Sequence, residues 1–212
     1  MPTRSVEFFD RQFRRQSAAG DYALNPFERA VLPYLHGEVL DLGCGLGNLA
    51  VAAAHAGCTV TALDASDAGI QDLERRAQQA GLPVRARVAD LSHYRASIHQ
   101  GKLEEDEITA GYDCVVSIGL LMFFSCEQAR EVLGELQRSV RPGGIAAVNV
   151  LVEGTTYMEM FDPAGYCLLG RDELHSALTG WEILLSRHDE FPAPGDTVKR
   201  FHTVVARRPA AR

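Results

Sequence analysis

Short apolar runs alternate with amphipathic segments along most of the chain, which is the pattern of strands that are connected by helices. The apolar runs contain Val, Ile and Leu, whereas the segments between them contain Ala, Leu, Glu and Arg at helical spacing. We therefore expect strands over 38–42, 58–63, 84–88, 112–118 and 145–152, with helices over 48–56, 67–80 and 127–140. Strands of this kind are typical of a parallel sheet that is buried on both faces.

Both ends of the chain depart from this alternation. The first 35 residues predict a helix with Phe8, Phe9 and Phe13 on one side, a loop around 20–22 and a second helix over 26–35. The last third predicts a helix over 171–178 and an antiparallel pair of strands over 181–186 and 200–206. Together the elements predict a doubly wound, Rossmann-like α/β sheet of about seven strands, mostly parallel with an antiparallel C-terminal edge and helices on both faces.

The chain lacks any stretch that resembles a linker, so we expect one domain over 1–212. Within it, residues 1–36 form a helical cover, 37–152 the binding core, and 153–212 a cover segment followed by the antiparallel strands. The segment 92–111 is longer than a connection needs and carries the acidic sequence LEEDE at 103–107. We interpret that acidic run as solvated surface.

Charge and cysteine content exclude several classes of protein. Twenty-one Lys and Arg residues against 28 Asp and Glu residues give a net charge of −7, which disfavours nucleic acid and anionic membranes as partners. The charged N-terminal segment and the lack of an 18-residue apolar run predict a cytoplasmic protein. Five cysteines without a C-x-x-C pair predict reduced thiols, neither a disulfide framework nor a metal site.

The most informative segment is a glycine-rich turn between the first strand and its helix. Gly43, Gly45 and Gly47 follow the strand directly, and such a turn presents backbone N–H groups to a ligand. The dinucleotide pattern G-x-G-x-x-G would require glycine at position 48, where this chain has Asn48. Asp41 precedes the turn, and its carboxylate would repel a pyrophosphate but attract an ammonium or a sulfonium.

Two more carboxylates follow the next two strands. Asp64 ends the second strand, where a carboxylate can bind both hydroxyls of a ribose, and Asp90 with Leu91 follows the third strand. Because the carboxyl ends of parallel strands share one edge of a sheet, we expect Asp41, Asp64 and Asp90 to converge there.

These motifs, in this order, resemble those of class I S-adenosylmethionine-dependent methyltransferases. The resemblance spans about residues 25–152 and rests on VLDLGCGLG at 39–47, ALD at 62–64, ADL at 89–91, YDCVVSI at 112–118 and RPGG at 141–144. The segment IGLLMFF at 118–124 and phrases in the last third are similar to the tellurite-resistance methyltransferases. The acidic segment 92–111 departs from that group.

The resemblance implies S-adenosylmethionine as the cofactor and assigns roles to residues of the core. Gly43, Gly45 and Gly47 would surround its methionine part, with Asp41 bonding toward the ammonium. The ribose would bind Asp64, and the adenine would lie among Ala65, Ile70, Asp90 and Leu91. Ile118 and Gly119 would lie beside the methionine part and the incoming nucleophile.

The expected function is methyl transfer to a small-molecule acceptor, such as a metalloid oxyanion or a thiol. A soft anionic nucleophile needs no general base, whereas a hydroxyl or a protonated amine needs one. Two alternatives stay open. A nicotinamide-dependent oxidoreductase would share the strand, the glycine turn and Asp64, although Asn48 and Asp41 count against it. A non-catalytic, nucleoside-binding regulatory subunit would keep the cofactor site without an acceptor pocket.

Four residues are candidates for the acceptor pocket. His188 beside Arg187 could attract an anion, Tyr22 could close over the cofactor, and Met122 could line an apolar wall. The competing interpretation is a surface pair for Arg187 and His188, and ordinary packing for Tyr22 and Met122. The residues identify neither the acceptor, nor a catalytic base, nor an oligomeric state.

Overall fold

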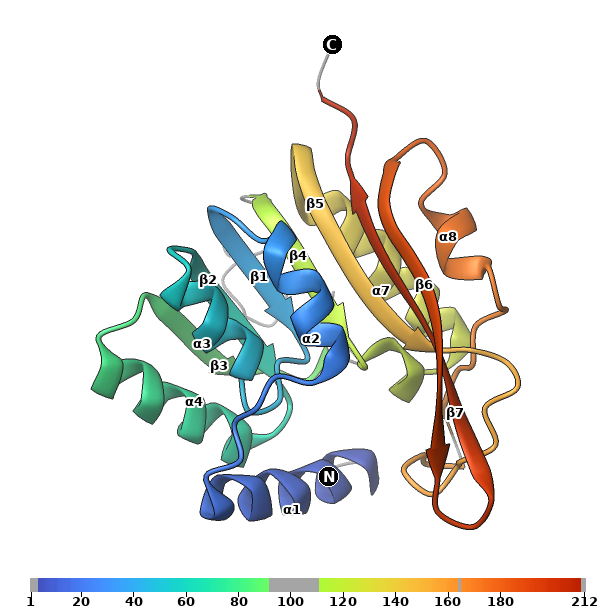
Figure 1. Ribbon diagram of the computed structural model, residues 1–212, viewed down its shortest axis with the longest axis horizontal. Helices are drawn as coiled ribbons and strands as arrows, with labels where there is room; N and C mark the ends of the chain where they lie inside the picture. The colour runs from blue at the N-terminus through green and yellow to red at the C-terminus, as the bar shows by residue number, and fades with distance from the viewer. Residues whose placement is uncertain (1–3, 92–110, 164, 211–212) are drawn as a thin grey trace.

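The computed structural model describes residues 4–91, 111–163 and 165–210, and a seven-stranded sheet runs through the described part (Figure 1). The strand order is β3-β2-β1-β4-β5-β7-β6. The strands are β1 Glu38–Leu42, β2 Thr59–Asp64, β3 Val84–Val88, β4 Tyr112–Ile118, β5 Val140–Leu151, β6 Glu182–Ala193 and β7 Thr197–Arg207. The first five are parallel to one another, and β7 runs antiparallel to both of its neighbours, β5 and β6. This order confirms the predicted sheet, including its antiparallel edge.

Helices cover both faces of the sheet, as predicted. The helices are α1 Arg4–Ala19, α2 Pro26–Val31, α3 Asn48–His55, α4 Asp67–Ala80, α7 Cys126–Ser139 and α8 Glu173–Ala177, with short 3-10 turns η1 Leu32–Tyr34 and η3 Leu121–Phe123. Apolar side chains of α2, α3 and α4 pack on one face, and those of α7 and α8 pack on the other. α1 lies across the carboxyl ends of the parallel strands, near the turn of the β6–β7 hairpin (Figure 1).

Strand and helix bounds differ from the prediction mainly toward the C-terminus. β5 begins at Val140, five residues before the predicted start. The expected turn at 141–144 is instead an irregularity within the strand, at which the pairing register with β4 shifts. β6 and β7 form a hairpin much longer than the two predicted strands, with Asp196 at φ 54° in its turn. The outer half of this hairpin lies beyond the sheet core and therefore lacks the apolar alternation that marks a strand.

The expectation that all five cysteines are reduced thiols is wrong for two of them. Cys126, the first residue of α7, forms a disulfide with Cys167 of the cover segment, with 4.7 Å between their Cα atoms. Cys44, Cys58 and Cys114 are thiols. The pair is separated by 41 residues, so only the tertiary fold reveals it.

Hydrogen bonds fasten α1 to α4. The carboxylate of Asp72 accepts from Ser17 Oγ at 2.7 Å, from Tyr22 Oη at 3.2 Å and from Arg76 Nε at 2.8 Å. Burial favours a higher pKa for Asp72, but hydrogen bonds from Ser17, Arg75 and Arg76 outweigh it and lower that pKa. The N-terminal cover is thus held to the core by a buried, charged network.

Two further expectations concern the acidic segment and the lack of a membrane-spanning helix. Most of the acidic segment, 92–110, lies outside them. Within the described part of the chain, no helix has both the length and the apolar character to cross a membrane.

Candidate active site

A cavity of about 710 Å³ opens at the carboxyl ends of the parallel strands, beneath α1. Every parallel strand contributes a residue at or near its end: Asp41, Asp64, Val88, Ile118 and Asn149. This volume lies in the range of small-molecule sites, and the end of a doubly wound sheet is where such folds bind ligands.

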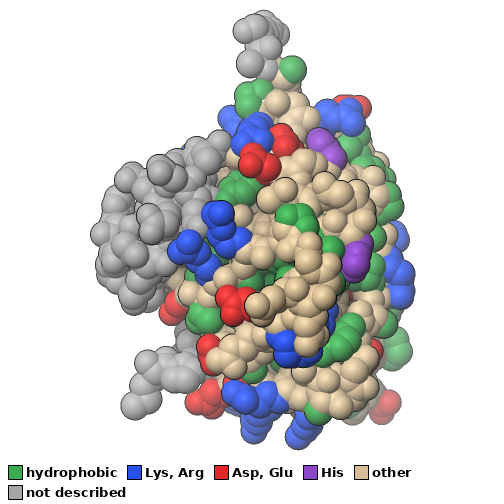
Figure 2. Space-filling view, turned by 90° about the vertical axis from the view of Figure 1, so that its left-hand side faces the viewer, with side chains coloured by type: hydrophobic (Ala, Val, Ile, Leu, Met, Phe, Trp, Pro, Cys, Tyr) green, Lys and Arg blue, Asp and Glu red, His purple; other side chains and the backbone are tan. Residues whose placement is uncertain are grey.

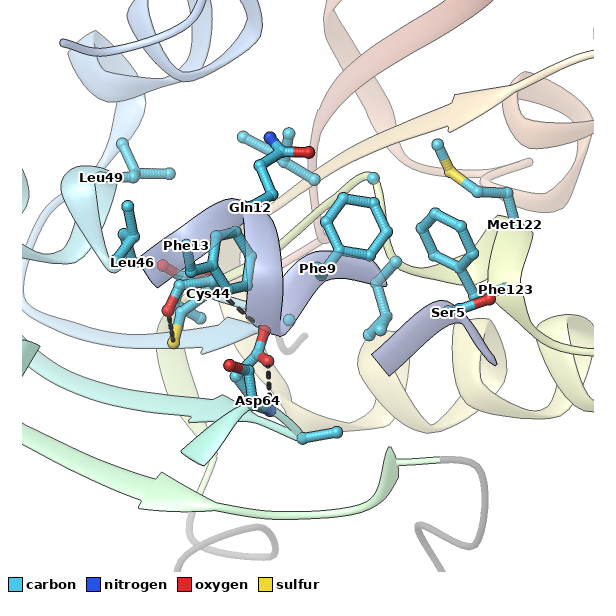
Figure 3. Close-up of a pocket in the computed structure, with 18 of the residues that line it drawn as sticks. Ser5, Phe9, Gln12, Phe13, Cys44, Leu46, Leu49, Asp64, Met122 and Phe123 are labelled. Carbon is cyan, nitrogen blue, oxygen red and sulfur yellow. Dashed lines mark hydrogen bonds between the residues drawn. The ribbon is translucent and has the colours of Figure 1, made fainter. Parts of the chain in front are cut away.

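The glycine turn forms the floor of the cavity, and neighbouring groups approach its backbone closely. Gly45 has φ 57°, and a Cβ there would lie 2.9 Å from the ring of Phe13 in α1. Gly47 has φ 67°, and a Cβ at this position would clash with the side chain of Leu73. Both positions therefore require glycine for conformation and for space. Figure 3 shows Phe13 reaching from α1 toward this turn.

Asp41 is a buried carboxyl whose neighbours repel its charge. Its exposed fraction is 4%. Burial, together with the charges of Glu28 and Asp64, raises the pKa of Asp41 to about 8. A cation beside Asp41 would offset both effects, so the cavity has an electrostatic place for an ammonium group.

Asp64 connects β2 to the glycine turn. Its carboxylate accepts hydrogen bonds from the backbone N–H groups of Gly45 and Ser66, each at 2.8 Å (Figure 3). Burial raises the pKa of Asp64, and these backbone hydrogen bonds oppose the rise. β1 and β2 are parallel neighbours with Leu42 opposite Leu63, so the ends that carry Asp41 and Asp64 lie side by side.

The structure brings most of the predicted cofactor residues to this cavity. The residues in its lining are Asp41, Gly43, Gly45, Asp64, Ala65, Asp90, Leu91, Ile118 and Gly119. Gly47 and Ile70 do not line it: Gly47 packs against Leu73, and Ile70 is buried between α4 and the sheet. Asn48 adds a polar atom that the prediction did not use, because its buried Oδ1 has no hydrogen-bond partner among the described residues. This set of donors and acceptors fits a nucleoside cofactor with an ammonium group.

Aromatic and methionine side chains form the rest of the cavity wall. Phe9 of α1 meets Phe123 of η3 with 5.1 Å between ring centroids, and Figure 3 shows Met122 beside this pair. Phe27 of α2 meets Phe201 of β7 at 4.5 Å. These side chains come from elements at both ends of the chain, and they give the cavity an apolar part next to its polar half.

Of the four predicted acceptor-pocket residues, only Met122 lines the cavity. Tyr22 belongs to the network of Asp72 that fastens α1. Arg187 pairs with Asp189 at 2.8 Å, and His188 stacks on the buried His202 with 4.0 Å between ring centroids. Arg187 and His188 therefore lie outside the cavity lining, and as consecutive residues of β6 they face opposite sides of the sheet.

Several lining residues were missed by reasoning from the sequence. They are Phe9, Phe13, Glu28, Asn149, Lys199 and Phe201. Glu28 carried a signal, since Asn25 and Glu28 have the spacing of a helix capping box, which the structure contains. Burial raises the pKa of Glu28. The other five have no local motif and become part of the site only through tertiary packing.

Two curated bacterial proteins are similar to this chain in sequence. Hemagglutinin 1 of Eikenella corrodens is 27% identical over 180 residues, which cover 81% of this chain and 55% of that protein. The ubiquinone biosynthesis O-methyltransferase of Maricaulis maris is 29% identical over 108 residues, covering 51% of this chain and 38% of that protein. The chain thus spans about half the length, or less, of these curated relatives.

Among solved structures, TehB from Haemophilus influenzae is similar in fold. The TM-score is 0.71 at 19% sequence identity, over 91% of this chain and 65% of that one. Residues 39–144, half of the chain, match the family described as "Methyltransferase domain". This range contains the glycine turn and the carboxylates of Asp41, Asp64 and Asp90. The chain therefore belongs to the methyltransferase domain family, whose cofactor is S-adenosylmethionine.

Proposed function

We propose that this protein transfers a methyl group from S-adenosylmethionine to a small-molecule acceptor. One observation carries the proposal. Asp41, Asp64 and Asp90 lie at or just beyond the ends of three different strands and line one cavity together with the glycine turn. The buried carboxyl of Asp41 would be stabilised by the ammonium group of the cofactor. The carboxylate of Asp64 can bind the ribose hydroxyl groups at its other polar part.

Residues of the chain would hold the cofactor in two parts. Asp41 and the turn at Gly43 and Gly45 would bind its amino-acid part, while Asp64 would accept from the ribose. Ala65 and Leu91 would flank the adenine, with Asp90 facing the amino edge. When bound, the cofactor supplies an activated methyl group on a sulfonium.

The N-terminal helical cover would position the acceptor next to the methyl group and exclude water from the cavity. Phe9 and Phe13 of α1 and Phe123 of η3 line the cavity, and Asp72 holds α1 in place. Alignment of the acceptor with the methyl group can contribute about 7–11 kcal/mol of barrier lowering. The acceptor is itself the nucleophile, so the reaction requires no nucleophilic side chain of the protein.

A small molecule fits the cavity better than a macromolecule does. The aromatic residues of the cover line the cavity, and Figure 2 shows Lys and Arg side chains interspersed with Asp and Glu on the face it presents. The net charge of −7 also opposes binding to nucleic acid. A metalloid oxyanion or a thiol as the acceptor rests on the resemblance to tellurite-resistance methyltransferases; the similarity to TehB concerns the fold alone.

Two alternatives have less support. A nicotinamide-dependent oxidoreductase would place a pyrophosphate at the turn, where Asp41 would repel it and Asn48 replaces the third glycine. A non-catalytic subunit would have no need for an apolar space beside the cofactor half, whereas this cavity has one.

Transfer of labelled methyl groups tests the proposal. We would incubate the protein and the Asp64→Ala variant with methyl-tritiated S-adenosylmethionine and a bacterial cell extract, then separate small molecules from protein and RNA. We expect label in the small-molecule fraction with the wild-type protein and at least about tenfold less with the variant. Label confined to protein or RNA would contradict the small-molecule acceptor, and no label in any fraction would contradict the activity.

A further inference from the structure

Asn149 lies beside the end of β4, where the nucleophile would approach the methyl group. It is fully buried on β5, and its backbone oxygen accepts a hydrogen bond from Gly119 N–H at 3.0 Å. In the register of the sheet it lies between Ile118 and Thr203. Ile118, Gly119 and Asn149 all line the cavity.

The side-chain amide of Asn149 is fixed in one orientation. Its Nδ2 donates to Thr203 Oγ1 at 2.9 Å, so β7 holds the nitrogen end. Its Oδ1 is buried and has no hydrogen-bond partner among the described residues. A buried acceptor without a donor costs free energy, and a ligand that brings an N–H or O–H group removes that cost.

The surroundings of Asn149 favour a neutral group over an anion. A carbonyl oxygen is the negative end of a dipole, and Glu28 and Asp41 add acidic groups to the same cavity. Lys199 is the cation in the lining, and its Nζ lies 4.4 Å from the centre of the Tyr157 ring. The side chains of Phe27 and Phe201 provide an apolar wall for the body of a ligand.

We propose that Asn149 Oδ1 accepts a hydrogen bond from the reacting group of the methyl acceptor, which is a neutral amine or hydroxyl on an apolar, ring-containing body. This inference rests on the proposed methyl transfer. It specifies the acceptor class and makes Asn149 the residue that orients the nucleophile. A fully deprotonated oxyanion has no hydrogen to donate and would face the carbonyl oxygen directly, so this site disfavours it.

The reaction balances with this acceptor. The lone pair of the amine nitrogen or hydroxyl oxygen forms a bond to the methyl carbon while the carbon–sulfur bond breaks. The electron pair of the broken bond stays on sulfur, and the positive charge passes to the acceptor. For an amine, Asn149 Oδ1 stabilises the N–H group as it becomes more acidic, and the proton passes to water after the transfer. A hydroxyl instead releases its proton to a base from the solvent as the new bond forms, and the product is a neutral ether.

Binding of naphthalene probes tests the inference without knowledge of the natural acceptor. 2-Naphthylamine and 2-naphthol carry the proposed reacting groups, whereas 2-naphthoate has the same ring with an anion, and tellurite is an oxyanion without a ring. Each would be titrated calorimetrically into the wild-type protein saturated with S-adenosylhomocysteine, and methyl-tritiated S-adenosylmethionine would report turnover of the same compounds.

Variants separate the role of Asn149 from a general effect on folding. Asn149→Leu removes the acceptor at similar volume, and Asn149→Ala removes it with less steric risk. Ser117→Ala is the matched control, because Ser117 Oγ is also buried and lacks a partner among the described residues but lies outside the cavity lining. The affinity of each variant for S-adenosylhomocysteine checks that its cofactor half is intact.

We expect the amine or the hydroxyl probe to bind at least about tenfold more tightly than 2-naphthoate or tellurite. Both Asn149 variants should lose at least about tenfold of that affinity, with S-adenosylhomocysteine binding within about twofold of wild type, and Ser117→Ala should lose none. Equal or tighter binding of 2-naphthoate or tellurite, unchanged probe affinity in both Asn149 variants, or no probe binding to the loaded wild type would overturn the inference. Absence of S-adenosylhomocysteine binding to the wild type would instead contradict the proposed function.

Discussion

The carboxylate of Asp64 accepts a hydrogen bond from the backbone N–H of Gly45 at 2.8 Å. This bond joins the end of β2 to the glycine turn after β1, 19 residues earlier in the chain. The turn is therefore held in shape by the same carboxylate that would bind the ribose. Substitution of Asp64 acts on both, which makes it the most informative position in the cofactor half.

Close packing at Gly47 predicts that substitution by alanine destabilises the protein more at Gly47 than at Gly81, a glycine of similar conformation. Gly47 has φ 67° and would meet Leu73, whereas Gly81 has φ 63° and open space around it. Gly81→Ala should cost about 1 kcal/mol for the left-handed conformation alone. Gly47→Ala should cost about 2–4 kcal/mol, because the clash adds to that strain. Urea unfolding measures both; equal losses would contradict the close contact.

The raised pKa of Asp41 predicts how stability depends on pH. The ordinary pKa of 3.8 applies to the unfolded chain, and that of the folded protein is about 8. Between these values the folded state binds a proton that the unfolded chain has released, so the free energy of unfolding falls as pH rises from about 4 to about 8. We expect this fall in urea unfolding without cofactor.

The Asp41→Asn variant is the control for this pH dependence. The amide does not titrate, so the fall in stability with pH should be shallower than in the wild type. The raised pKa values of Asp64 and Glu28 leave a smaller fall of the same sign. Parallel curves for the two proteins would show that Asp41 is ionised in the folded state.

The polar half of the cavity could be predicted from the sequence because its carboxylates lie at or just beyond the ends of strands. Asp41 and Asp64 come at the ends of short apolar runs, and Asp90 comes two residues after β3; parallel strands bring such ends to one edge. Local sequence therefore defines both the element and the position of its last side chain. The same reasoning predicted β1, β3, β4 and α4 with their observed bounds.

The acceptor half could not be predicted, because it is formed by long-range packing. Phe9, Phe27, Asn149 and Lys199 belong to four elements, and none lies in a motif that marks a site. Arg187 and His188 carried a plausible chemical signal, but the register of the β6–β7 hairpin places neither in the cavity lining. The sequence showed that a cationic and an imidazole side chain are adjacent, but the direction in which each side chain points depends on how the two strands pair.

The bond between Cys126 and Cys167 predicts both a thiol count and a loss of stability. In denaturant without reductant, three thiols should react with Ellman's reagent, namely Cys44, Cys58 and Cys114. After reduction the count should be five. Reduction should also lower the free energy of unfolding by about 2–4 kcal/mol, because the bond closes a long loop in the unfolded chain. Five reactive thiols in the unreduced protein would contradict the bond.

The network around Asp72 predicts that α1 can be loosened from the core. Asp72→Ala removes the acceptor for Ser17, Tyr22 and Arg76, and it leaves a largely buried guanidinium of Arg76 without its partner. We expect a loss of about 2–3 kcal/mol and faster trypsin cleavage within α1. Glu74→Ala, on the exposed side of the same helix, should change neither. Unchanged cleavage in Asp72→Ala would show that other contacts hold α1.

Calorimetric titration of S-adenosylhomocysteine tests the central claim most directly, with the wild type, Asp64→Asn, Asp64→Ala and the exposed control Asp67→Ala. We predict micromolar binding to the wild type and to Asp67→Ala, with no binding of NADH. Both Asp64 variants should bind at least about tenfold more weakly, which corresponds to about 1.4 kcal/mol for a lost charge-assisted hydrogen bond. Binding of NADH without S-adenosylhomocysteine, or equal affinity in the wild type and both Asp64 variants, would contradict the assignment of this cavity.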